Sequence, residues 1–164
     1  MRLLALDQSS KTSGFAVFED GKLIDYGHFT FTDAELGARL CKIKDKVDSL
    51  IDEYNIDTVI YEDIQYQRNV TGGVKTFKAL AEVIGVIYEL LHRREIPNSA
   101  VLSTVWKSVV GIRGLTRDEQ KSNAQAYIKE TYGLKCTQDE SDAICIGTYY
   151  FKKNIHETET SWSK

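Results

Sequence analysis

The sequence predicts an α/β domain in which a mixed five-stranded sheet carries helices on both faces. Two observations lead to this fold class. The opening segment reads as three strands joined by short turns, and after it strands alternate with amphipathic helices. The chain has 164 residues, which suits a single domain. We expect that domain to span residues 1–152, followed by a polar tail over residues 153–164.

The opening segment predicts an antiparallel meander. Its apolar runs at residues 2–7, 13–19 and 22–31 have the length of strands. Asp20-Gly21, between the second and third runs, is typical of a tight hairpin turn because both residues tolerate positive φ. We therefore expect these three strands to lie side by side.

A helix should follow the meander, with Thr32 or Asp33 as its cap and Glu35 in its first turn. Its apolar residues recur every three or four positions, so one face of the helix should be buried. These residues are Leu36, Leu40, Ile43, Val47, Leu50, Ile51 and Tyr54. Asn55, which tolerates the left-handed conformation, is expected to end the helix.

Strands and helices alternate in the rest of the chain. Residues 57–62 are rich in Val and Ile, as a central parallel strand would be. Gly72-Gly73 precedes a long helix predicted over residues 74–94, and Pro97 prevents its continuation. The remaining predicted elements are a strand at residues 99–102 and helices at residues 103–110, 117–132 and 139–152.

The composition narrows the possible functions and locations. No apolar stretch is long enough for a membrane span, and we expect no membrane contact. Cys41, Cys136 and Cys145 are odd in number and lack metal-ligand spacing, which favours reduced thiols in a cytoplasmic protein. The net charge is −3, but residues 62–122 have a balance of +2, which leaves room for a local phosphate-binding surface.

Four acidic residues are the candidate functional site. Asp7 and Glu62 each close an apolar strand, and Asp139 and Asp142 share one face of the last helix. Four converging carboxylates repel one another unless a cation relieves them. Oxygen-only ligands favour Mg²⁺, with Mn²⁺ as a substitute, and such a site suits two-metal hydrolysis of phosphodiesters. Taken singly, an acid after an apolar run is better explained as a solvated strand end or a helix cap, and Asp139 alone as a helix N-cap; the recurrence of the acids is what favours a metal site.

Four segments, in order, resemble RuvC-type Holliday junction resolvases. They are LLALDQSSKTSGFAVFEDGKL, VIYEDIQ, VWKSVVGIRGLTRDEQK and DESDAICIG. The resemblance covers about residues 2–150 and implies an RNase H-like fold. It also implies a homodimer that cuts four-way DNA in recombination and repair and leaves 5′-phosphate ends. Short members of this kind occur in phages, so a phage-infected host cell is a second possible location.

The resemblance assigns roles to residues by position. Asp7, Glu62, Asp139 and Asp142 would be catalytic metal ligands, and Lys107 would be a further catalytic residue that also contacts DNA. Lys121 also matches a family lysine near the DNA backbone. Apart from the resemblance, the basic residues Arg68, Lys75, Arg113 and Arg117 could line the junction, and Ser9 and Tyr66 are further candidate DNA contacts.

Two of these assignments come from departures from the family pattern. The family often has Asp-Pro-Gly or Asp-Pro-Ser after the first strand, where this chain has Asp7-Gln8-Ser9-Ser10, so Ser9 could donate to a phosphate. The family can place an aromatic residue three positions after the Glu, where it enters the base stack. Here Gln65 occupies that position, and Tyr66 is the candidate wedge.

The long helix at residues 74–94 is apolar around more of its circumference than one sheet-facing stripe requires. The second side could meet a partner subunit or lie beneath loops of the same chain. The first side would comprise Ile84, Ile87 and Leu91, and the second Val83, Val86 and Leu90.

Other functions remain open at this point. The same acids would serve an RNase H-type hydrolase of RNA–DNA hybrids. A non-catalytic module that binds branched DNA would not need them. The opening hairpin also resembles the phosphate loop of sugar-kinase-like proteins. Those proteins require a second similar domain and an adenosine site, for which the chain has no room, so we expect no nucleotide cofactor.

Overall fold

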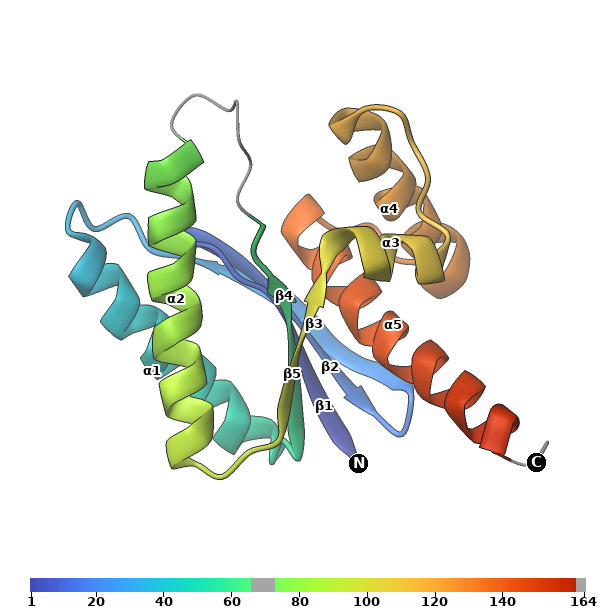
Figure 1. Ribbon diagram of the computed structural model, residues 1–164, viewed down its shortest axis with the longest axis horizontal. Coiled ribbons are helices and arrows are strands. Elements are labelled where there is room, and N and C mark those ends of the chain that lie inside the picture. Colours follow the sequence, from blue (N-terminus) through green and yellow to red (C-terminus); the bar gives the residue numbers. More distant parts are fainter. Residues whose placement is uncertain (66–72, 162–164) are drawn as a thin grey trace.

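The computed structural model describes residues 1–65 and 73–161 and has the predicted fold class (Figure 1). Its strands are β1 (Arg2–Asp7), β2 (Thr12–Glu19), β3 (Lys22–Thr30), β4 (Thr58–Asp63) and β5 (Asn98–Leu102). Its helices are α1 (Leu36–Tyr54), α2 (Gly73–Arg93), α3 (Ser103–Val110), α4 (Arg117–Tyr132) and α5 (Gln138–Ser161).

The five strands form one mixed sheet in the order β3-β2-β1-β4-β5. The meander pairs antiparallel, whereas β1–β4 and β4–β5 are parallel pairs. At the turn between β2 and β3, Asp20 and Gly21 have φ of 49° and 82°, the positive values that the sequence predicted for this turn. The central strand β1 is thus flanked by β2 and β4, and the ends of β1 and β4 lie side by side.

Helices cover both faces of the sheet, as Figure 1 shows: α1 and α2 lie on one side, and α3, α4 and α5 on the other. The two-residue period of β1 divides its side chains between these layers. Leu4 and Leu6 face α1 and α2, whereas Leu3 and Ala5 face α5. Both faces of β1 are therefore buried, which explains its unbroken apolar run.

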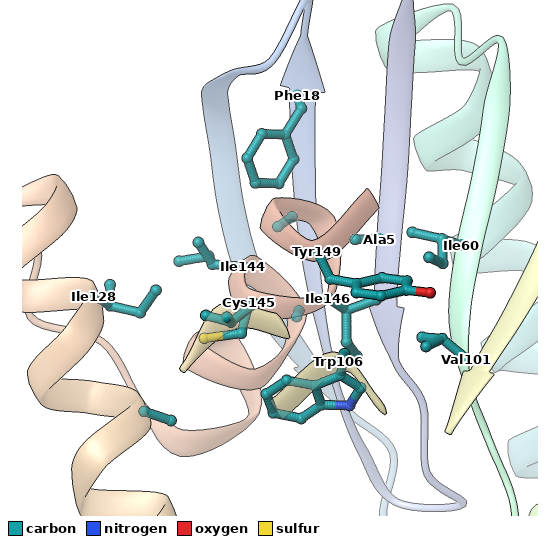
Figure 2. Packing of buried hydrophobic residues seen from close by; sticks show 14 of the residues in the cluster. Ala5, Phe18, Ile60, Val101, Trp106, Ile128, Ile144, Cys145, Ile146 and Tyr149 are labelled. Atoms are coloured by element: carbon teal, nitrogen blue, oxygen red, sulfur yellow. The ribbon is translucent and has the colours of Figure 1, made fainter. Parts of the chain in front are cut away.

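The core on the α5 side is built around an aromatic residue of α3. Trp106 is fully buried and lies among Val101, Ile146 and Tyr149 (Figure 2). Gly147 lets α5 approach the sheet closely, because a Cβ there would lie 2.2 Å from the Phe18 ring. Burial of a side chain as large as Trp stabilises the fold by several kcal/mol, on the order of 3–5 as judged by truncation to Ala.

The cap predicted for the first helix was wrong. The helix begins at Leu36, its N-cap is Glu35, and no side chain caps it. Asp33 instead binds Lys42, with its carboxylate oxygens 2.7 and 2.9 Å from Nζ. The guanidinium of the buried Arg39 donates to the Ala34 carbonyl in the preceding loop at 3.1 Å and to the Ser10 carbonyl in the β1–β2 turn at 2.7 Å. These longer-range contacts displace the local capping geometry.

The last helix is longer than predicted. It continues to Ser161, whereas we expected it to end at residue 152 and be followed by a polar tail. The polar composition of residues 153–161 gives no core-facing stripe, but it contains no Pro or Gly that would end a helix. Within the described residues, no helix has the length and apolar character that crossing a bilayer requires. Cys41, Cys136 and Cys145 are free thiols, as expected.

The division of the long helix into two apolar sides needs correction. Val83 and Leu90 of the second side, which could have met a partner subunit or been covered by the same chain, are buried within the chain together with Ile87 and Leu91 of the first. The outward side of α2 is instead formed by Val74, Ala81, Gly85 and Tyr88, which recur at helical spacing and are all exposed. The prediction failed because the apolar arc is wide and its inward centre could not be fixed from the sequence.

Candidate active site

Asp7 and Glu62 end neighbouring strands and point to the same face of the sheet. Ala5 of β1 and Ile60 of β4 are paired in parallel register and both belong to the core under α5. Each acid follows its core residue by two positions, which is the period that returns a side chain to the same face. The fold therefore brings these two carboxylates to one edge of the sheet, beneath α5.

Asp139 and Asp142 lie in the first turns of α5. The helix is capped by Thr137 and Glu140, which form a reciprocal pair: the Glu140 N–H donates to Thr137 Oγ1 at 3.4 Å, and the Thr137 N–H donates to Glu140 Oε2 at 2.7 Å. Asp139 is therefore not the N-cap that it could have been from the sequence alone. The carboxylate of Asp139 therefore does not cap the helix.

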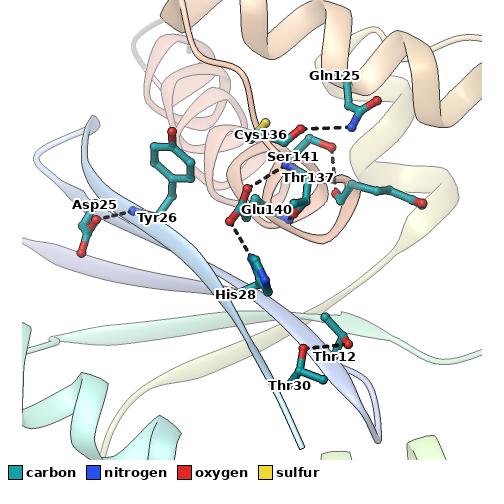
Figure 3. Close-up of polar contacts among 11 residues, drawn as sticks. Thr12, Asp25, Tyr26, His28, Thr30, Gln125, Cys136, Thr137, Glu140 and Ser141 are labelled. Atoms are coloured by element: carbon teal, nitrogen blue, oxygen red, sulfur yellow. Dashed lines mark hydrogen bonds and ion pairs between the residues drawn. The ribbon is translucent and has the colours of Figure 1, made fainter.

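Three contacts fix the start of α5 against the rest of the domain. His28 Nδ1 of β3 lies 2.7 Å from Glu140 Oε1, and Gln125 of α4 donates to the Cys136 carbonyl at 3.1 Å (Figure 3). Gly14 of β2 permits the closest approach, because a Cβ there would lie 1.9 Å from the Asp139 carbonyl oxygen. The sequence did not indicate a partner for His28, since the two residues of this pair are 112 positions apart.

The four acids line one pocket of about 230 Å³. Its lining comprises Asp7, Gln8, Ser9, Glu62, Leu80, Lys107, Arg117, Gln120, Lys121, Gln138, Asp139 and Asp142. The acids come from β1, β4 and α5, and the cations from α3 and α4. The spatial convergence that the sequence predicted for the four carboxylates is thus present.

Burial raises the pKa of three of these acids, Asp7, Glu62 and Asp142. Burial raises the pKa of Asp7 well above its usual range, and the charges of Asp142, Glu62 and Asp139 raise it further. Burial also raises the pKa of Asp142 to about 6, although Lys107 opposes this shift. The pKa of Glu62 is raised by burial, and a hydrogen bond from Trp106 offsets part of the change.

The donor set suits a hard divalent cation. All four side chains are carboxylates, and a cation between them would offset the repulsion among their charges. Among the described residues, however, no group of three or more His, Cys, Asp or Glu side chains is already arranged to hold a metal ion. The acids surround the pocket without closing into a finished coordination site. Nearby, the buried Gln8 Oε1 has no hydrogen-bond partner in the described part of the chain, whereas its Nε2 donates to the Glu62 carbonyl.

Trp106 is a site residue that the sequence analysis missed. Its Nε1–H donates to Glu62 Oε2 at 2.8 Å, so one carboxylate oxygen is fixed in direction. The neighbouring Lys107 lies with Nζ 5.2 Å from the centre of the Trp106 ring and 3.3 Å from Gln120 Oε1. A Trp directly before a candidate catalytic Lys was a signal, but its partner lies 44 residues away in sequence.

The residues predicted to contact DNA fall into three groups. Lys107, Arg117 and Lys121 line the pocket. Arg113 is exposed on the loop before α4, and Lys75 is exposed on α2. Tyr66 and Arg68 lie outside the described residues.

Ser9 also lines the pocket, but its hydroxyl is already engaged. It donates to the Thr12 carbonyl at 2.5 Å and accepts from the N–H groups of Lys11 and Thr12 at 3.3 and 3.2 Å. The proton of Ser9 is therefore not available to a phosphate in this conformation. Its role is to close the turn between β1 and β2.

A second, larger hollow adjoins the pocket and shares Ser9 and Leu80 with it. It has a volume of about 1290 Å³ and lies between the β1–β2 turn, the segment before α1 and the start of α2. Three exposed lysines line this basic groove, namely Lys11, Lys75 and Lys78. Its two acids are Asp33, which is paired with Lys42, and Glu82.

Comparison with known proteins gives one consistent family. A family model described as crossover junction endodeoxyribonuclease RuvC matches residues 3–150. The curated protein of that name from Dictyoglomus thermophilum is 29% identical over 160 residues, covering 92% of this chain and 97% of the relative. That from Thermomicrobium roseum is 26% identical over 157 residues, covering 93% of each.

Solved structures show the same fold. RuvC from T. thermophilus in complex with a Holliday junction substrate superposes with a TM-score of 0.75 at 14% identity, covering 95% of this chain and 96% of the other. Fowlpox virus resolvase, solved with Holliday junction DNA, gives a TM-score of 0.62 at 15% identity, covering 94% of this chain and 99% of that one.

Proposed function

This chain belongs to the RuvC family of crossover junction endodeoxyribonucleases, and from that premise we propose that it resolves four-way DNA junctions by metal-dependent phosphodiester hydrolysis. One observation carries the assignment of the site. Asp7, Glu62, Asp139 and Asp142 come from three separate segments and line a single pocket. A fold that merely bound DNA would not need four carboxylates gathered in one pocket, three of them (Asp7, Glu62 and Asp142) with raised pKa values.

The four carboxylates would hold Mg²⁺, with Mn²⁺ as a substitute, because both cations prefer oxygen ligands. When bound, the cation supplies activation of water and neutralisation of the charge that develops on the phosphate and the leaving oxygen. Hydrolysis of this kind leaves a 5′ phosphate.

Residues of the chain itself prepare the pocket for a phosphate. The Trp106 indole fixes one oxygen of Glu62 and leaves the other for the site. Lys107 is held by its contacts with Trp106 and Gln120, where its charge lowers the pKa of the neighbouring acids. Arg117 and Lys121 share one face of α4 and line the pocket, where they would bind phosphate oxygens on either side of the scissile bond.

The outward side of α2 supports assembly as a homodimer. Val74 and Tyr88 are 58% and 55% exposed, and Ala81 and Gly85 lie between them on the same side. Small residues between large apolar ones allow two helices to approach closely, and a two-fold axis would direct two pockets at two strands of one junction. Such a substrate would place the protein in the cytoplasm of a bacterium or of a phage-infected bacterial cell.

Asp7→Asn tests the assignment. The change removes a charge at constant size, so we expect cleavage of a synthetic four-way junction in Mg²⁺ to fall by at least about a thousandfold while junction binding persists. Asp45→Asn, at an exposed position of α1, is the matched control and should cleave normally. A parallel RNA–DNA hybrid separates junction resolution from RNase H activity. Retained junction cleavage by Asp7→Asn would refute the proposed site.

A further inference from the structure

The loop between α3 and α4 presents an apolar side chain to solvent beside the candidate active site. Leu115 is 99% exposed, more than any other large hydrophobic residue that the structure describes. A single exposed Leu is ordinary by itself, although it forgoes about 1.5–3 kcal/mol that burial would contribute. Leu115 differs from an ordinary exposed Leu in two respects: its loop is held firmly, and charged residues lie on both sides of it.

The loop is held rigidly against α4. Three side chains of α4 bind its backbone: Glu119 accepts from the Leu115 N–H at 2.7 Å, Gln120 donates to the Gly114 carbonyl at 3.1 Å, and Asn123 donates to the Arg113 carbonyl at 2.5 Å. Gly114 lies so close to α4 that a Cβ would come within 2.8 Å of the Gln120 nitrogen. Leu115 is thus fixed in an outward position, and folding it back would break these contacts.

The surroundings of Leu115 are cationic. Arg113 and Arg117 lie two residues to either side, and neither forms an ion pair within residues 1–65 and 73–161. Arg117 also lines the pocket that holds the four acids. An apolar tip between two free guanidinium groups suits a partner with apolar faces and anionic edges. Stacked bases with their flanking phosphates have this chemistry, because every nucleotide carries an anionic group that can pair with an arginine.

We propose that Leu115 is a wedge that presses against an unstacked base step of the junction, while Arg113 and Arg117 hold the adjacent phosphates. The inference rests on the proposed function. Two extended residues span at most about 7 Å, so the backbone of Leu115 lies close to Arg117, which lines the pocket. Apolar side chains used in this way help to unstack DNA and can bend it. Leu115 would therefore select distorted DNA near the strand exchange over a regular duplex.

The test measures base unstacking directly. A junction with 2-aminopurine next to the strand exchange is titrated with protein carrying Asp7→Asn, so that no strand is cut. We expect binding to raise the fluorescence severalfold, and Leu115→Ala to abolish most of that rise while weakening binding by no more than about tenfold. Leu115→Met should restore the signal, because Met is also an apolar wedge. Val109→Ala, at an exposed position of α3, is the control and should behave like the parent.

The outcomes separate the two proposals. Because Leu115 is fully exposed, its truncation should leave the melting temperature unchanged. If the parent binds the junction and Leu115→Ala gives the same fluorescence rise, the wedge is refuted and the proposed function stands. The wedge is also refuted if Leu115→Ala changes only the oligomeric mass. If the chain neither binds nor cuts a junction, the proposed function fails and the wedge fails with it.

Discussion

Replacing Asp142 with Asn should make the metal-free protein more stable near neutral pH. Burial raises the pKa of this carboxyl from 3.8 to about 6, with Glu62 and Asp139 adding to the shift. The folded protein therefore holds this proton more tightly than the unfolded chain does. Its stabilising effect is complete below pH 3.8 and is lost as the pH rises through about 6. Asn cannot ionise, so the variant avoids this loss.

The size of the stability gain follows from how far the pKa of Asp142 is raised on folding. A change of roughly two pKa units corresponds to about 3 kcal/mol, which is an upper limit because the side chain is partly exposed. For a domain of this size that is up to about 10 °C in melting temperature. The gain should be near zero at about pH 4 and reach its maximum by about pH 8.

Urea unfolding followed by circular dichroism, in EDTA and at several pH values, measures this gain. Asp45→Asn, on the exposed side of α1, is the control and should show no such pH dependence. Added Mg²⁺ should reverse the order, since it stabilises the parent more than the variant that lacks a ligand. A variant no more stable than the parent at about pH 8, or a gain of equal size at about pH 4, would refute the reasoning.

Two further predictions concern residues around the pocket. Trp106→Phe keeps most of the buried volume but removes the hydrogen bond to Glu62, so the pKa of Glu62 should rise further. We expect cleavage to fall by about tenfold to a hundredfold and the acid limb of its pH–rate profile to move to higher pH. An acid limb at the same pH as in the parent would argue against this role of Trp106. Lys75→Gln combined with Lys78→Gln in the basic groove should reduce the slope of log Kd against log salt concentration by about one per lysine that contacts a phosphate. The control is Lys129→Gln, exposed on α4, which should leave the slope unchanged. An unaltered slope in the double variant would show that DNA does not contact this groove.

Local patterns were sufficient to predict most of the fold. The apolar runs of β1 and β4 located Asp7 and Glu62 at strand ends, and Asn55 ends the first helix in the left-handed conformation as expected. The three-residue spacing of Asp139 and Asp142 placed both acids on one side of α5. These features depend on backbone geometry that neighbouring residues determine.

Features that depend on distant partners could not be predicted. The hydrogen bond from Trp106 to Glu62 and the pairing of Asp33 with Lys42 become visible only once the helices have packed. Two signals were present and overlooked. Thr116 with Glu119, and Thr137 with Glu140, have the spacing of capping boxes, and each marks the start of its helix.

Gly14 has a consequence for how the active site can vary. It pairs with Asp7 across the first two strands, and its own Cα lies against the backbone of Asp139. The distance between β2 and the start of α5 is therefore set by contact between main-chain atoms. No side chain lies between them whose size a substitution could change. Substitutions elsewhere in the domain can change what the pocket binds. The spacing between Gly14 and Asp139 cannot change without moving the backbone of β2 or α5.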